Sequence, residues 1–229
     1  MKKSFFIFVV VASALFVVPA ANAQKVDSFA GTVKFSVKYE GNTNPKDHAP
    51  YEQTITILGN KMKVSDPSGE IQIMDCNEPS IIFLYDYPGY KCGYTESKEV
   101  IEERFESKKF TYVKGEETMT ICGYLCTRYD VTIFDTDTEE ETKIIVYTTT
   151  EIGENNEINN LDYPGLTGFP LYEESEIKGV KKTEKAIEIK KTKVKAVEFL
   201  VPTAYKMFPS YMEWALFMRA SFEKNKSEE

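Results

Sequence analysis

An alternation of apolar and polar residues with a period of two constrains this chain most strongly, because it is typical of strands with one buried face. Phe29, Gly31, Val33, Phe35 and the later odd positions to 39 share one face, and the even positions from 32 to 38 are polar. Residues 53–58 and 61–65 predict a hairpin that turns at positions 59–60, where the sequence is Gly-Asn. Residues 70–75 and 80–85 predict a second strand pair.

The strand pattern returns after a stretch of ambiguous sequence. Residues 97–106 suit either a helix or a strand with a charged face, so both remain open. Strands are expected at residues 110–113, 118–121, 127–134, 143–149, 171–177 and 186–197. Turns are expected at Lys114-Gly115, at Gly123, over 135–141 and near Gly179, and loops over 41–50 and 153–161. Successive strands joined by such turns predict an antiparallel meander.

One helix is predicted near the end of the chain, over residues 210–222. Ser210 is expected as its N-cap, and Glu213 three residues later completes a capping box. An aromatic stripe follows at helical spacing: Tyr211, Trp214, Phe217, Met218 and Phe222. The fold class is therefore mainly β, with one large curved antiparallel sheet in an open half-barrel and a C-terminal helix packed on it. A closed barrel is the alternative.

The first 23 residues have the organisation of a cleavable signal peptide. Lys2 and Lys3 precede fourteen uncharged residues, 5–18, and Ala21 and Ala23 form an A-x-A cleavage site. Fourteen residues are fewer than the roughly 20 that a membrane span needs. Residues 24–229 are thus expected as a single domain in the periplasm or secreted, with no transmembrane segment after cleavage.

The charge balance argues against nucleic acid as a partner. Removal of the leader leaves 26 basic residues against 36 acidic ones, a net charge of −10. Lysines gather between 178 and 195, interleaved with Ile187, Ile189 and Val194, which indicates the solvated face of a strand pair.

Four cysteines in an exported chain suggest disulfides. Of the three connectivities, Cys76–Cys92 with Cys122–Cys126 is favoured because each pair closes a short loop. A four-thiolate zinc site and a redox-active pair both fit the cysteine spacings poorly.

No short catalytic motif is present, and we expect a protein that is not an enzyme and holds no metal or cofactor. The single histidine, His48, lies in a polar loop with two prolines. Residues 135–141 carry alternating carboxylates but lack the glycine and final glutamate of a calcium loop. A hydrolase with a carboxylate pair stays open, because such enzymes carry no short motif.

Four segments together resemble a known group of proteins. They are 121–129 (ICGYLCTRY), 144–152 (IIVYTTTEI), 164–171 (PGLTGFPL) and 194–205 (VKAVEFLVPTAY). In this order they resemble a family of exported bacterial domains of unknown function, which is similar to the LolA/LolB-like lipoprotein-localisation fold and to the group named for its Gly-Leu-Pro-Gly-Leu-Ile motif. Tyr147 stands where relatives commonly carry tryptophan.

The resemblance implies a strongly curved sheet whose concave side faces helices and can hold acyl chains, with no agreed catalytic residues. No motif assigns Arg104, Arg128 or Arg219 to the cargo-release role of the carrier's arginine. The expectation is a periplasmic binding module for a lipid, an acylated envelope protein or another hydrophobic ligand, of unknown oligomeric state. The candidate ligand-binding residues are Phe83, Tyr85, Tyr147, Trp214, Phe217 and Met218, with the aromatic stripe as cargo mimic or lid. The alternative is a structural or interaction domain whose helix fills the concave face.

Overall fold

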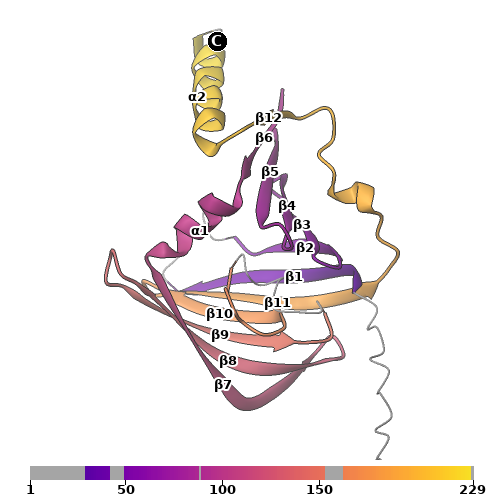
Figure 1. Ribbon diagram of the computed structural model, residues 1–229, viewed down its shortest axis with the longest axis vertical. Helices are drawn as coiled ribbons and strands as arrows, with labels where there is room; N and C mark the ends of the chain where they lie inside the picture. Colours follow the sequence, from indigo (N-terminus) through magenta and orange to yellow (C-terminus); the bar gives the residue numbers. More distant parts are fainter. Residues whose placement is uncertain (1–28, 42–48, 88, 153–161, 228–229) are drawn as a thin grey trace, which may run out of the picture.

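The computed structural model describes residues 29–41, 49–87, 89–152 and 162–227, with side chains described as far as Ser221. The twelve strands in these ranges join one open sheet in the order β12-β6-β5-β4-β3-β2-β1-β11-β10-β9-β8-β7 (Figure 1). Neighbouring strands are antiparallel except β12 and β6, which are parallel. The expected fold class is confirmed as one large open, mainly β sheet, with the correction that it is mixed at this edge. The alternative of a closed barrel is wrong.

The elements have the following bounds. The strands are β1 Ala30–Gly41, β2 Tyr51–Leu58, β3 Lys61–Ser65, β4 Glu70–Asp75, β5 Ser80–Tyr87, β6 Tyr90–Glu96, β7 Lys108–Ile121, β8 Tyr124–Asp135, β9 Glu141–Thr149, β10 Phe169–Ile177, β11 Val180–Lys191 and β12 Lys206–Phe208. The helices are α1 Lys98–Glu106 and α2 Tyr211–Ser227, and a 3-10 turn, η2, spans Ala196–Phe199.

The elements differ from the expected ones in four places, and one open alternative is resolved. The ambiguous residues 97–106 form helix α1. The turn expected at Lys114-Gly115 is instead a register shift inside the long strand β7. Strands β6 and β12 were not predicted, and β11 ends at Lys191, so that residues 196–199 form η2 instead of extending a strand. The predicted loop 153–161 and most of the loop 41–50, with His48, lie outside the described residues, as does the leader 1–23.

The connection through α1 requires the sheet to be strongly curved. Ten strand spacings separate β6 from β7, which would be about 48 Å in a flat sheet. The chain joins these two strands through α1, a helix of nine residues that is about 14 Å long. The two ends of the sheet must therefore approach each other, and α1 lies across the opening between them (Figure 1). Ile101 anchors α1 because its side chain is buried in the main hydrophobic core.

The two faces of the sheet are covered differently. On the concave face, Val33 and Phe35 of β1 are buried in the main core, as their alternation predicted. On the opposite face of β4 and β5, Ile73 and Leu84 pack with Phe199 of η2 in a separate core. Residues 192–205 cross this outer face and lead from β11 to the far edge, which explains how β12 comes to pair in parallel with β6.

The predicted C-terminal helix is present and packs at one end of the sheet. The backbone N–H of Glu213 donates to the Ser210 hydroxyl at 3.3 Å, which makes Ser210 the N-cap. Helix α2 contacts β6 and β12 and extends beyond the end of the sheet (Figure 1). Across the described ranges, no helix has the length and apolar character that a membrane crossing demands.

Candidate functional site: a cavity on the concave face

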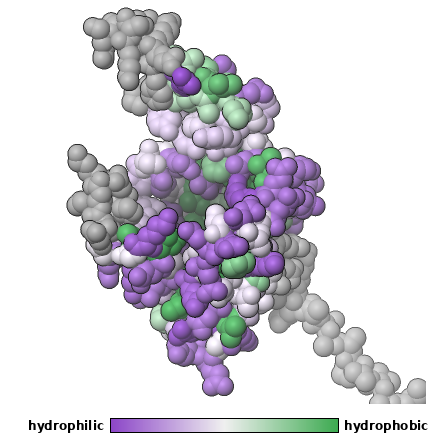
Figure 2. All heavy atoms as spheres, turned by 90° about the vertical axis from the view of Figure 1, so that its left-hand side faces the viewer, coloured by the Kyte–Doolittle hydropathy of each residue, from purple (hydrophilic) through white to green (hydrophobic). Residues whose placement is uncertain are grey.

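The concave face encloses a cavity of about 540 Å³. Figure 2 shows the corresponding hollow, with hydrophobic residues at its floor and hydrophilic residues around its rim. This volume lies within the range of about 300–1,000 Å³ that small-molecule sites occupy. No side chain of α2 from Tyr211 to Ser221, the part that the structure describes, lines the cavity.

The floor of the cavity is mostly apolar and comes from the first five strands, which also contribute Gln53 and Gln72 to the lining. These strands place alternate side chains on the concave face, so that hydrophobic residues from adjacent strands lie side by side. The floor residues are Phe35, Ile55, Met62, Val64, Met74, Ile81 and Phe83, and Phe169 of β10 adjoins them. Unbranched methionine side chains adapt to irregular shapes, which suits a surface that packs against flexible chains.

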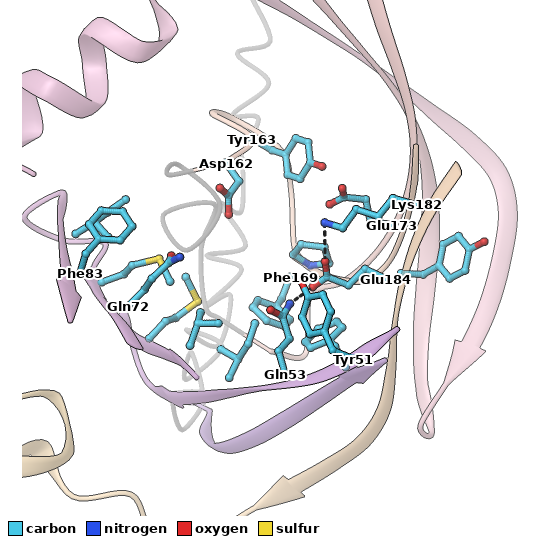
Figure 3. Close-up of a pocket in the computed structure, with 18 of the residues that line it drawn as sticks. Tyr51, Gln53, Gln72, Phe83, Asp162, Tyr163, Phe169, Glu173, Lys182 and Glu184 are labelled. Atoms are coloured by element: carbon cyan, nitrogen blue, oxygen red, sulfur yellow. Dashed lines mark hydrogen bonds and ion pairs between the residues drawn. The ribbon is translucent and has the colours of Figure 1, made fainter. Parts of the chain in front are cut away.

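The wall of the cavity is polar and comes mainly from β10 and β11. Glu184 is bonded on both carboxylate oxygens, because Gln53 donates to Oε1 and Lys182 Nζ lies 3.1 Å from Oε2 (Figure 3). The Tyr163 hydroxyl donates to Glu173 of the neighbouring strand β10. The wall is thus a chain of linked polar groups opposite an apolar floor.

Asp162 completes this wall from the segment that precedes β10. Its carboxylate points into the cavity (Figure 3). Asp162 is exposed to solvent, and no hydrogen bond or ion pair joins its carboxylate to another described residue, although the charges of Arg104 and Lys182 attract it. Arg104 of α1 lines the same cavity and is paired with Glu96.

Burial and mutual repulsion shift the pKa values of the wall residues. Burial raises the pKa of Asp162, and the Glu184 carboxylate raises it further. Burial also raises the pKa of Glu173, although the hydrogen bond from Tyr163 opposes this. Burial disfavours charged Lys182, but the attraction of Glu184 and Glu173 is larger and raises its pKa. Burial raises the pKa of Tyr51 to about 12.

The position of Lys182 differs from the one that the sequence predicted. The lysine run 178–195 was expected on a solvated face, and Lys181 does pair with Glu174 on the outer face. Lys182, however, lines the cavity together with Glu184. None of the wall residues Asp162, Tyr163, Glu173 and Glu184 was among the predicted site residues.

Of the six predicted ligand-binding residues, Phe83 lines the cavity and four others gather outside it. Trp214 of α2 stacks on Tyr85 at 4.8 Å between ring centroids, and Phe217 meets Tyr90 edge to face at 6.2 Å. The Met218 sulfur lies 3.5 Å from the Cys92 sulfur. These side chains pack against one another beneath α2, and Phe222 lies beyond the described side chains.

Tyr147 lies apart from the other five candidates, on the outer face of the sheet. It pairs with Arg128 and Tyr172, whereas its neighbour Val146 pairs with the cavity residue Glu173. Adjacent residues of a strand point to opposite faces, so Tyr147 faces outward. Its hydroxyl donates to Glu117 at 3.2 Å. The structure therefore does not bring Tyr147 to the concave cavity.

The two expected disulfides are not formed, although all four cysteines are described. Asp75 pairs with Ser80 and Tyr85 with Cys92, so that Cys76 and Cys92 lie at opposite ends of their strands, about 20 Å apart. That separation far exceeds the reach of a disulfide. Cys122 occupies the turn itself, and Cys126 pairs with Met119, not with Cys122.

The described ranges also contain no group of three or more histidine, cysteine, aspartate or glutamate side chains that could hold a metal ion. The acidic residues 135–141 form the turn between β8 and β9, where Asp135 Oδ1 accepts the N–H groups of Asp137 and Thr138. Comparison of the sequence with protein-family models and with curated proteins finds no match.

Proposed function

We propose that this chain is a periplasmic, non-enzymatic binding module that holds a lipid or another hydrophobic ligand on the concave face of its sheet. The cavity of about 540 Å³ carries this proposal, because most of its floor consists of aliphatic, methionine and aromatic side chains, with Gln72 as a polar residue between Val64 and Phe83. The resemblance to lipoprotein-localisation domains supports the same function. The alternative of a helix-filled concave face has less support, since none of the described side chains of α2 lines the cavity.

Binding of an uncharged apolar dye tests this proposal. N-phenylnaphthylamine fluoresces strongly in apolar surroundings, and we expect saturable enhancement with the folded protein. Native mass spectrometry of protein purified from the cell envelope should also detect a co-purified amphiphile. If the dye gains no signal and no amphiphile is found, the proposal is wrong.

A pair of matched substitutions locates the binding. Val64→Phe places a larger side chain in the cavity floor and should weaken dye binding by about ten-fold, because the added ring occupies ligand space. Val113→Phe makes the same change on edge strand β7, where the valine is 57% exposed, and should leave binding unchanged. Equal effects of both variants would place the dye elsewhere on the molecule.

A hydrolase is the second candidate, and the pair Asp162 and Glu173 is the observation that favours it. Both carboxyl groups line one cavity and both have raised pKa values, as a general acid requires. Turnover of nitrophenyl glycosides or esters that is lost in Glu173→Gln would establish this activity. We expect no turnover above buffer, because the aliphatic floor offers few polar groups to orient a sugar.

A further inference from the structure

The lining of the cavity carries more acidic than basic side chains, and the acidic ones lie on the polar wall. Lys182 is engaged by Glu184, and Arg104 is engaged by Glu96. Each cation of the lining is therefore already paired with a carboxylate, although Lys182 also attracts Glu173 and Asp162, and Arg104 attracts Asp162. The remaining acidic groups of the lining are Asp162 and Glu173.

The two remaining carboxyl groups differ in their hydrogen-bond partners. Glu173 accepts one hydrogen bond, from the Tyr163 hydroxyl. Asp162 points into the cavity and has no hydrogen-bond or ion-pair partner among the described residues. A carboxylate that points into a cavity without a bonded partner can form charge-assisted hydrogen bonds with a cation that binds there.

We propose that the cavity selects amphiphiles with a positively charged amine or ammonium head group, which lies between Asp162 and Glu173 while the apolar tail lies on the floor residues. This inference rests on the proposed function and specifies its ligand class. Burial raises the pKa values of both carboxyl groups, and a cation nearby would lower them again, so ligand binding and ionisation support each other. An anionic head group would instead meet three carboxylates of the wall: Asp162, Glu173 and Glu184.

Displacement of N-phenylnaphthylamine by three ligands with the same ten-carbon tail tests the inference. Near pH 8, decylamine carries a positive charge, decanol is neutral and decanoate is negative. We expect decylamine to displace the dye at about ten-fold lower concentration than decanol, and decanoate to be the weakest of the three.

Two variants test whether the carboxyl groups of the wall cause the preference for decylamine. Asp162→Asn and Glu173→Gln should each remove most of the advantage of decylamine over decanol, and saturable dye binding by each variant reports that the cavity remains folded. Glu174→Gln is the matched control, because this side chain pairs with Lys181 on the outer face and should leave the order of the three ligands unchanged.

The outcomes separate the two proposals. If decanol or decanoate displaces the dye as well as decylamine does, the head-group inference is overturned and the binding function stands. A decylamine advantage that survives both wall variants also overturns it. If the dye does not bind, or none of the three ligands displaces it, the binding function fails and the inference fails with it.

Discussion

Glu173 and Glu174 are consecutive residues of β10 whose side chains lie on opposite faces of the sheet. Glu173 lines the cavity, where burial raises its pKa. Glu174 lies outside, where the Tyr172 hydroxyl and Lys181 both bind its carboxylate and lower its pKa. The two residues therefore make opposite contributions to the dependence of stability on pH.

The free energy of unfolding of Glu173→Gln should depend on pH differently from that of the wild type. A raised pKa in the folded state means that the stabilising contribution of Glu173 is complete below its ordinary value of 4.5 and is lost as the pH rises through the shifted value. The amide cannot ionise, so the variant should match the wild type near pH 4 and be more stable near pH 8. Urea titrations at several pH values measure this.

Glu174→Gln should show the reverse sign in the same titrations. Its lowered pKa means that the carboxylate stabilises the fold above its ordinary value of 4.5 and loses that contribution as the pH falls. The variant should be less stable than the wild type near pH 7 and equal to it in acid. If both variants shift in the same direction, the assignment of the two side chains to opposite faces is contradicted.

Strand β11 was predicted from its alternation, but the bulge at Ile187 within it was not. Alternation identified the strand, and Val33 pairs with Ile189 as a shared inner face requires. Lys34 then pairs with Glu188 but Phe35 with Ala186, so that Ile187 is an extra residue. This bulge exchanges the faces of every residue that precedes it in β11.

The bulge explains why the polar wall was not predicted. Without it, Ile187 would point inward with Ile189, and Lys182 and Glu184 would point outward as the lysine pattern indicated. With it, Ile187 is 46% exposed, and Lys182 and Glu184 enter the cavity. A bulge depends on pairing between distant segments, which local periodicity does not record. The strands that form the apolar floor, β1 to β5, alternate regularly, and local periodicity does record that pattern.

Trp214 makes two of the aromatic contacts that attach helix α2 to strands β5 and β6. Trp214 contacts Tyr85 and Tyr94 with ring centroids 4.8 and 5.3 Å away, and it is the only tryptophan in the chain. Trp214→Ala should cost about 2 kcal/mol of packing and raise the undocked population of α2 about thirty-fold. Trypsin cleavage after Arg219 should accelerate accordingly, while the circular dichroism of the sheet stays unchanged.

Two controls accompany this prediction. Met212→Ala removes a side chain of α2 that is 66% exposed and should leave the cleavage rate unchanged. Trp214→Phe should be mild, because the Trp214 Nε1 group has no hydrogen-bond partner in the described part of the chain and nothing polar is lost. Equal cleavage of Trp214→Ala and the wild type would show that other contacts hold the helix.

For the whole molecule, the pairing of β1 with β11 is what creates an amphipathic cavity. Gly31 pairs with Lys191, so that residues far apart in the chain meet in the middle of the sheet. Strands β1 to β5 supply the apolar floor on one side of this seam, and β10 and β11 supply the polar wall on the other (Figures 1 and 3). Neither half of the sheet contains the complete site.

Gly31 is therefore the position where a single methyl group should disturb both fold and site. A Cβ atom at Gly31 would lie 2.1 Å from the backbone oxygen of Lys190, a contact that only a shift of β11 against β1 can relieve. We expect Gly31→Ala to lower the free energy of unfolding by about 3 kcal/mol in urea titrations, since overpacking against backbone cannot relax through a rotamer change.

The same shift should weaken dye binding even where Gly31→Ala remains folded, because it moves Lys182 and Glu184 relative to the floor. Gly115→Ala is the matched control: its nearest contacts are Arg128 side-chain atoms at 3.5 Å, an ordinary separation, and β7 is an edge strand. This variant should stay within about 0.5 kcal/mol of the wild type and bind the dye normally. If Gly31→Ala behaved like Gly115→Ala, the close approach of β1 and β11 would be contradicted, and with it the joining of floor and wall into one cavity.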